Sequence, residues 1–98
     1  MRRHFQYYAL FTPNGNGYTI EFPDVSGAIS EGYTFDDAYS MAQDCLALLL
    51  ISMQEKGRDV PKPSTEEEIK RVAEDGDQIV LVSVDCKELY PEYDYDEL

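Results

Sequence analysis

"TIEFPDVSGAISEGYTFDDAYSMA", residues 19–42, is the stretch most informative about the fold, because it joins a strand-like segment, a chain reversal and the start of a helix. Pro23 ends the first segment, since proline has no backbone N–H to donate to a neighbouring strand. Gly27 permits a tight reversal, after which residues 28–31 can return as a short strand. This stretch therefore predicts the second half of a small antiparallel meander.

The aspartates of this stretch raise the question of a catalytic site. Thr34 and Asp37 have the spacing of an N-cap residue followed by an acidic residue at the third helical position. Asp36 and Asp37 also place negative charge at the positive end of the helix dipole. Both aspartates thus have a structural role at the start of a helix, and their presence alone does not indicate catalysis.

Upstream, residues 4–12 alternate in polarity with aromatic side chains on one side, which predicts a strand. Residues 13–17, with the sequence PNGNG, favour a tight turn. Residues 18–22 alternate again and predict the strand that follows. The inward side chains expected in these two strands are Phe5, Tyr7, Ala9, Phe11, Tyr18, Ile20 and Phe22.

Downstream, residues 35–56 have the apolar periodicity of a long amphipathic helix that covers the sheet. Met41 and Leu48 lie at the margin of its apolar face, and Ile51 falls nearly opposite the centre of that face. These three side chains are candidates for a partner-binding or self-association surface. The apolar face itself is expected to contain Phe35, Ala38, Ala42, Cys45, Leu46, Leu49 and Met53.

The C-terminal half predicts one further helix and one further strand. Residues 64–76 resemble a short capped helix with Ile69, Val72 and Ala73 facing inward. Residues 78–84 are apolar on both faces, which favours a buried strand. With one helix across one face, this strand can pair in parallel with the first one, so we expect an α+β fold with a mixed four-stranded sheet of order 3-2-1-4.

Composition limits the possible functions. The chain has 98 residues, enough for one domain, and a formal net charge of -12. Binding a nucleic-acid backbone requires clustered Lys and Arg, so direct nucleic-acid binding is not expected, whereas a basic protein partner is compatible. The sequence shows no secretory signal and no apolar run long enough to span a bilayer, and it has two isolated cysteines. We expect a cytoplasmic protein with reduced thiols.

Residues that could carry catalysis or bind a cofactor are sparse. His4 is the only histidine, and no nucleophile is placed beside it by sequence. Neither cysteine has a neighbour at zinc-ligand spacing, and no glycine-rich phosphate loop opens a helix. A magnesium-binding nuclease site could be imagined, but acidic residues are too frequent here for the grouping to be specific. Its carboxylates would be Glu21, Asp24, Glu31, Asp36 and Asp37. We predict no metal, no cofactor and no enzymatic activity.

Residues 85–98 form an acidic, tyrosine-containing tail after a domain expected to span residues 1–84. The tail is either a loose, solvated end or a peptide that docks on a basic partner. Its candidate docking residues are Glu92, Tyr93, Asp94, Tyr95, Asp96 and Glu97.

The combined motifs resemble the N-terminal domain of the HicB antitoxins and their stand-alone relatives. In that family, a strand ending in Phe-Pro-Asp is followed by a glycine turn, a Gly-x-Thr helix cap, an acidic residue and an alanine. A later Pro-x-Pro-Ser segment matches VPKPS, residues 60–64. The matching positions of the first motif are Gly17, Tyr18, Phe22, Pro23, Asp24, Gly27, Gly32, Thr34, Asp37 and Ala38.

The resemblance implies a partial ribonuclease-H-like fold and a non-enzymatic role. The expected partner is a small, basic HicA-type RNA-cleaving toxin, which the chain would bind and block. Asp24 is expected to bond loop amides after the proline. Because few residues follow the last strand, promoter binding by a C-terminal module is not expected. Separately, the position of Met41, Leu48 and Ile51 at or beyond the core margin and the exposed edges of a small sheet predict a dimer or larger homo-oligomer. The alternative is a stand-alone oligomeric domain with a regulatory or small-molecule-binding role and no toxin partner.

Overall fold

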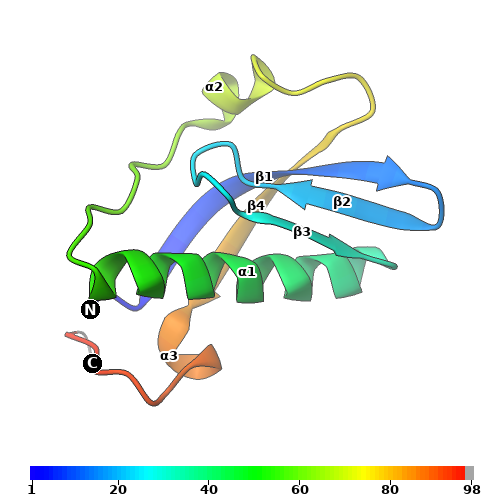
Figure 1. The fold of residues 1–98 in the computed structure, drawn as a ribbon. Coiled ribbons are helices and arrows are strands. Elements are labelled where there is room, and N and C mark those ends of the chain that lie inside the picture. Colours follow the sequence, from blue (N-terminus) through cyan, green and yellow to red (C-terminus); the bar gives the residue numbers. More distant parts are fainter. Residues whose placement is uncertain (97–98) are drawn as a thin grey trace.

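The computed structural model describes residues 1–96 as an α+β fold with a single four-stranded sheet (Figure 1). The strands are β1 (His4–Asn14), β2 (Gly17–Glu21), β3 (Ile29–Gly32) and β4 (Gln78–Asp85). The helices are α1 (Phe35–Glu55), α2 (Glu66–Lys70) and α3 (Cys86–Leu89). The sheet order is β3-β2-β1-β4, and α1 lies along one face. The predicted fold class and strand order are confirmed.

The predicted direction of β4 was wrong, because β4 pairs with β1 in an antiparallel register that matches Phe5 with Val84. Helix α1 returns the chain to the end where β1 begins, and there the Arg2 N–H donates to Gln54 Oε1 at 2.8 Å. Residues 56–77 then cross the sheet a second time and reach its other end, where Thr12 Oγ1 donates to Asp77 Oδ1 at 2.6 Å. The prediction counted α1 as the only crossing. Two crossings make the sheet antiparallel throughout.

The core lies between the sheet and α1. The inward alternation of β1 is confirmed, since Phe5, Tyr7, Ala9 and Phe11 are all buried. They pack in one cluster with side chains from the other strands and from α1, and this burial is the main stabilising contribution to the fold. The cluster also contains Ile20, Phe22, Val82, Val84, Ala38, Ala42, Leu46 and Leu50.

The buried face of α1 is wider than predicted. Cys45, Leu49 and Met53 are half-buried, and Phe35 remains 41% exposed at the helix start. Ile51, which was expected to face away from the core, is only 1% exposed. Burial extends to this side because α3 and the residues after it pack on a second side of α1, where the Tyr90 hydroxyl donates to Asp44 Oδ1. Asp44 and Ile51 lie two helical turns apart and therefore share that side.

The other face of the sheet is only partly covered. Helix α2 lies on the side opposite α1 (Figure 1) and buries Ile69, but it ends at Lys70 and leaves Val72 57% exposed. Leu81 of β4 is 41% exposed. The predictions of a buried Val72 and of a β4 buried on both faces were therefore wrong, because α2 is too short to cover the whole outer face. Within residues 1–96, no helix is both long and apolar enough to cross a membrane.

Candidate functional site

The loop after β2 is tied to the second crossing of the sheet through Asp24. The Asp24 carboxylate accepts hydrogen bonds from the backbone N–H of Ser64, at 2.7 Å, and from its hydroxyl, at 2.6 Å. Asp24 was expected to bond amides of its own loop, so the observed partner corrects that expectation. The loop closes on itself separately, with the Phe22 N–H donating to the Ala28 carbonyl at 3.1 Å. Asp24 thus joins the two sequence motifs, and this contact is architectural.

The start of α1 lies against β3 at backbone contact. A Cβ atom added to Gly32 would lie 2.5 Å from the Cα of Ala38, and one added to Gly17 would lie 2.3 Å from the carbonyl oxygen of Gly32. Thr34 Oγ1 caps the helix by accepting from the Asp37 N–H at 3.0 Å, and the Asp37 carboxylate accepts from the Tyr33 N–H at 2.9 Å. These motif residues fix the position of the helix beside the edge strand.

The carboxylates considered for a magnesium site are not assembled into one. Among residues 1–96, no three His, Cys, Asp or Glu side chains gather in a way that could hold a metal ion. The Asp24 carboxylate is hydrogen-bonded to Ser64, and the Asp37 carboxylate is hydrogen-bonded to the Tyr33 N–H at the start of α1.

The two edges of the sheet differ in how their backbone groups are satisfied. On β4, the register directs the N–H and C=O groups of Ser83 away from β1. Both groups are bonded by side chains of α1, since the Ser83 N–H donates to the Tyr39 hydroxyl at 3.1 Å and Gln43 Nε2 donates to the Ser83 carbonyl at 2.8 Å. Capping of this kind blocks the pairing of another strand at that point.

On β3, the outer backbone groups are open at Glu31 but not at Ile29. The bond from the Phe22 N–H to the Ala28 carbonyl sets the register, so Ser30 and Gly32 face β2 and the backbone groups of Ile29 and Glu31 point outward. The Ile29 N–H donates to the Gly27 carbonyl at 3.1 Å, and the Ile29 carbonyl accepts only a long contact from Cys45 Sγ, at 3.7 Å. Within residues 1–96, no hydrogen bond satisfies the outward N–H and C=O of Glu31.

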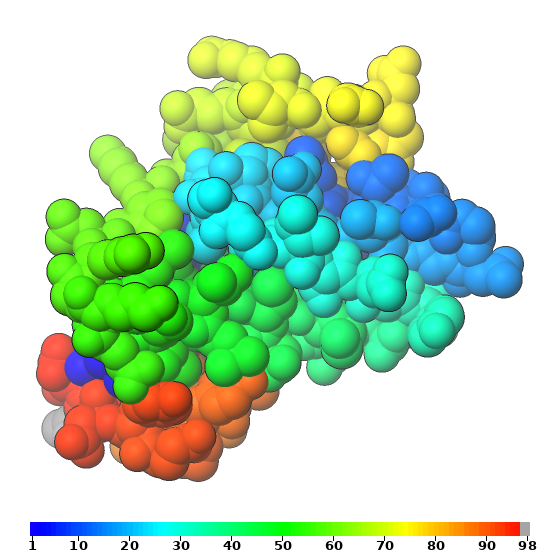
Figure 2. Space-filling view, viewed as in Figure 1, coloured from blue at the N-terminus to red at the C-terminus, as the bar shows by residue number. Residues whose placement is uncertain are grey.

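Exposed apolar side chains lie beside this open edge. Met41 and Leu48 of α1 are 43% and 45% exposed, and Tyr33, between β3 and α1, is 81% exposed. Met41 and Leu48 share one side of the helix because they lie two turns apart. In the view of Figure 2, α1 is visible between β3 above it and the C-terminal residues below it. We call the outer groups of Glu31 together with Tyr33, Met41 and Leu48 the β3-edge surface.

A depression of about 350 Å³ adjoins the β3-edge surface. Glu31, Tyr33 and Met41 contribute to its wall, together with Asn14, Asn16 and Tyr18 from the β1–β2 turn.

The charge around this surface has a single sign. Residues 4–55, which form β1, β2, β3 and α1, contain no Lys and no Arg. The eight basic residues of the chain are confined to residues 2–3 and 56–87. The acidic residues within 4–55 are Glu21, Asp24, Glu31, Asp36, Asp37, Asp44 and Glu55. This part of the molecule attracts cationic partners and disfavours anionic ones.

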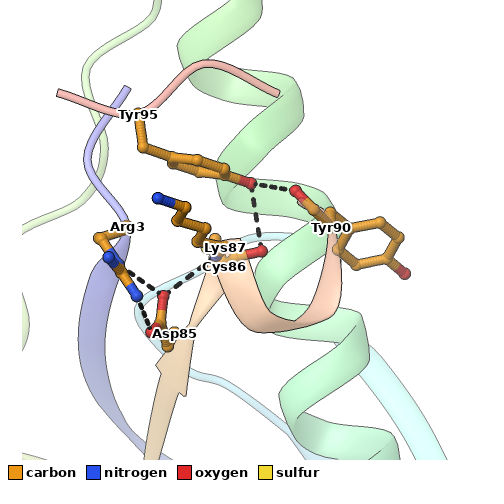
Figure 3. Close-up of polar contacts among 6 residues, drawn as sticks. All are labelled: Arg3, Asp85, Cys86, Lys87, Tyr90 and Tyr95. Carbon is orange, nitrogen blue, oxygen red and sulfur yellow. Dashed lines mark hydrogen bonds and ion pairs between the residues drawn. The ribbon is translucent and has the colours of Figure 1, made fainter. Parts of the chain in front are cut away.

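The C-terminal residues are packed against the fold, so the expectation of a loose tail was wrong as far as residue 96. Asp85 pairs with the Arg3 guanidinium, whose hydrogen bonds lower the pKa of the Asp85 carboxyl, and it accepts from the Lys87 N–H at 3.0 Å (Figure 3). The Tyr95 hydroxyl lies against the Cys86 and Tyr90 carbonyls, at 3.1 and 2.7 Å (Figure 3).

The candidate docking residues of the tail therefore differ in how far their side chains are exposed. Tyr93 and Tyr95 are half-buried against the core, whereas Glu92, Asp94 and Asp96 are exposed. Asp96 pairs with the N-terminal ammonium at 3.2 Å, and Glu97 lies outside the described residues. The exposed carboxylates remain available for a partner, while Tyr95 holds the tail to its own domain.

Comparison with known proteins identifies the fold and its motifs. The family described as the HicB-like antitoxins of bacterial toxin–antitoxin systems matches residues 7–94. The chain belongs to this family. HicB-like proteins are toxin-neutralising proteins rather than enzymes, which agrees with the structural roles found here for Asp24 and Asp37.

Individual relatives agree with the family assignment. Antitoxin HicB 2 of Photorhabdus laumondii subsp. laumondii is 34% identical over 68 residues, which cover 69% of this chain and 49% of that protein. This HicB-like chain therefore spans about half the length of the curated relative. The N-terminal domain of antitoxin HicB of Burkholderia pseudomallei is 30% identical, with a TM-score of 0.68, over 83% of this chain and 99% of that one.

A chain of a toxin–antitoxin complex from Streptococcus pneumoniae has the same fold, with a TM-score of 0.72 at 23% identity. The match covers 97% of this chain and 80% of that one.

The motif residues are recognisable in the sequence, whereas the difference in backbone hydrogen bonding between the two sheet edges is not. Tyr39 and Gln43 give no sequence signal of their role, because it depends on the register that directs Ser83 outward. The absence of Lys and Arg from residues 4–55 is visible in the sequence and could have indicated the polarity of this surface.

Proposed function

We propose that this chain is an antitoxin that binds and inhibits a small, basic HicA-type RNA-cleaving toxin. The observation that carries the proposal is the open edge of β3 beside exposed apolar side chains, in a part of the chain without Lys or Arg. Membership of the HicB-like family supports it, as does the presence of the same fold in a toxin–antitoxin complex.

Inhibition of this kind requires binding without catalysis. A ribonuclease that holds RNA through a cationic surface binds a protein of charge -12 with the same groups, so the bound antitoxin excludes the RNA backbone. No metal or cofactor is needed for this action, and the chain does not itself bind nucleic acid. The complex would form in the cytoplasm, where the toxin meets RNA.

The direct test first seeks a neighbouring reading frame that encodes a small, basic HicA-like protein, and then measures RNA cleavage by that protein with and without the purified chain. Cleavage should fall to background once the chain is in molar excess, and the association rate should fall as salt rises, because exposed charges are screened over about 10 Å at 0.1 M ionic strength. Unchanged cleavage at excess antitoxin would overturn the proposal.

The acidic residues of the tail are proposed as a secondary contact. Because Tyr95 anchors the tail internally, deletion of the tail would also disturb the fold, and charge-neutralising changes are the cleaner test. Glu92→Gln combined with Asp94→Asn should slow association with the toxin and leave the unfolding midpoint unchanged. An association rate equal to that of the wild type would confine binding to the folded domain.

Self-association is proposed separately. Val72 and Leu89 are 57% and 42% exposed away from the residues that define the β3-edge surface, which supports a homodimer or larger closed assembly. Sedimentation at tens of micromolar should show a species larger than the monomer, and a monomer alone at that concentration would contradict self-association.

A further inference from the structure

We propose that the toxin contributes a basic strand that pairs with the free edge of β3 and extends the sheet on the side where α1 packs. This inference rests on the proposed antitoxin function and assigns its binding surface and its mode of recognition. Strand addition of this kind derives affinity from backbone hydrogen bonds and specificity from alternate side chains.

The backbone geometry makes β3 suited to receive a strand. Its outward N–H and C=O groups at Glu31 have no partner within residues 1–96, and Ile29 offers a carbonyl that makes only one long contact. On the opposite edge, Tyr39 and Gln43 already bond the outward groups of Ser83. An incoming strand therefore finds open backbone groups at Glu31 on β3. On β4 the outward groups of Ser83 are blocked, and within residues 1–96 those of Leu81 are open.

The neighbouring surface supplies contacts for side chains as well. Gly32 faces α1 with no side chain, and it lies at backbone contact with Ala38. A strand added beyond β3 would direct alternate side chains toward the side of α1 that carries Met41 and Leu48. Apolar side chains at those positions of the partner would bury Met41 and Leu48, which are nearly half exposed in the free chain.

Charge decides which strand fits. Glu31 lies on the edge strand itself, and Asp36 and Asp37 lie in the first turn of α1 close by. A second copy of this chain would bring the Glu31 side chains of two molecules onto adjacent strands, where like charges repel. A strand with Lys or Arg on its outer face forms opposite-charge pairs at the same positions. The occupant is therefore a basic segment of the toxin rather than a second antitoxin chain.

The test uses one proline at each edge. In Glu31→Pro, the ring removes the outward N–H of β3 and leaves the groups that bond β2 in place, because the backbone groups of residue 31 do not face β2. Leu81→Pro is the matched control, since the register also directs the Leu81 N–H away from β1. With HicA as the probe, Glu31→Pro should raise the dissociation constant at least about tenfold, and Leu81→Pro should change it less than about twofold.

Two further measurements need no proline variant and therefore apply even if a proline disturbs folding. Met41→Ser and Leu48→Ser alter partly exposed side chains outside the sheet and should weaken binding several-fold while the protein stays folded, with only a small fall in the unfolding midpoint. Hydrogen exchange of the wild-type chain should show new protection of the Glu31 amide on addition of HicA, and no new protection at Leu81.

The outcomes separate this inference from the antitoxin function. If the wild-type chain binds HicA while Glu31→Pro and both serine variants bind equally well, strand addition at β3 is wrong and the antitoxin function stands. If the wild-type chain does not bind HicA at all, both proposals fail. Protection of Glu31 that depends on the concentration of the chain alone would assign this edge to a second copy and overturn the inference.

Discussion

The carboxylate of Asp24 holds Ser64, 40 residues further along the chain, through two hydrogen bonds of 2.7 and 2.6 Å. One bond is donated by the Ser64 backbone and the other by its hydroxyl. The contact fixes residues 56–77 as they cross the sheet for the second time, and the Tyr7 hydroxyl adds a bond to the Pro61 carbonyl on the same segment. This crossing sets the direction in which β4 enters the sheet.

Replacing Asp24 with alanine should lower the free energy of unfolding by about 1.5 to 3 kcal/mol, because both hydrogen bonds involve a charged acceptor. Chemical denaturation at pH 7 measures the loss. In a double-mutant cycle with Ser64→Ala, the two changes should be non-additive. Strictly additive losses would mean that Asp24 and Ser64 do not stabilise the fold through each other.

Gly32→Ala should destabilise the fold by about 3 kcal/mol or more, because the added Cβ would lie 2.5 Å from the Cα of Ala38 and force α1 away from β3. Gly15→Ala is the control, since Gly15 has a positive φ of 58° but nothing within 4 Å of an added Cβ. The control should lose only about 1 to 2 kcal/mol of backbone strain. Equal unfolding midpoints for the two variants would argue against close packing at Gly32.

Ile51→Ala should cost about 2 to 5 kcal/mol, because Ile51 is 1% exposed and the substitution leaves a cavity between α1 and the C-terminal residues. Leu48→Ala, on the same helix but 45% exposed, should cost less than about 1 kcal/mol. Denaturant titration of both variants gives the comparison. A loss at Ile51 as small as that at Leu48 would show that the C-terminal residues do not cover this side of α1 in solution.

Tyr90→Phe should lower stability by about 1 kcal/mol at pH 7 by removing the hydrogen bond to Asp44. That bond, with burial, raises the pKa of Tyr90 to about 12. A tyrosine in the unfolded chain titrates near pH 10, so the folded state holds this proton more tightly. The stabilisation by the Tyr90–Asp44 hydrogen bond is therefore complete below about pH 10 and is lost as the pH rises toward 12.

Free energies of unfolding, measured for the wild type and for Tyr90→Phe at pH 7, 9 and 11, test the direction of this pH dependence. The difference between the two proteins should persist at pH 7 and 9 and shrink at pH 11. Tyr33→Phe is the control, because Tyr33 is 81% exposed and its replacement should leave the free energy of unfolding nearly unchanged. A difference that grows at pH 11 would contradict the assigned role of Asp44.

Local sequence patterns are sufficient to predict the elements whose causes are local. Alternation placed Phe5, Tyr7, Ala9 and Phe11 on one face of β1, because strand side chains repeat with a period of two. The spacing of Thr34 and Asp37 placed the start of α1, because a cap bonds only to the first turn of its own helix. Strand order followed from these elements, and the motif residues led to the HicB-like family.

Features that depend on contacts between distant segments are visible only in the folded chain. The direction of β4 follows from the second crossing by residues 56–77, and that crossing is held by contacts such as Asp24 to Ser64 that no local pattern encodes. Ile51 is buried because the C-terminal residues return to α1, and helical periodicity cannot reveal a second layer. The contrast between Ser83, capped on β4, and Glu31, open on β3, arises from strand register, which directs each backbone group inward or outward only once the sheet has formed.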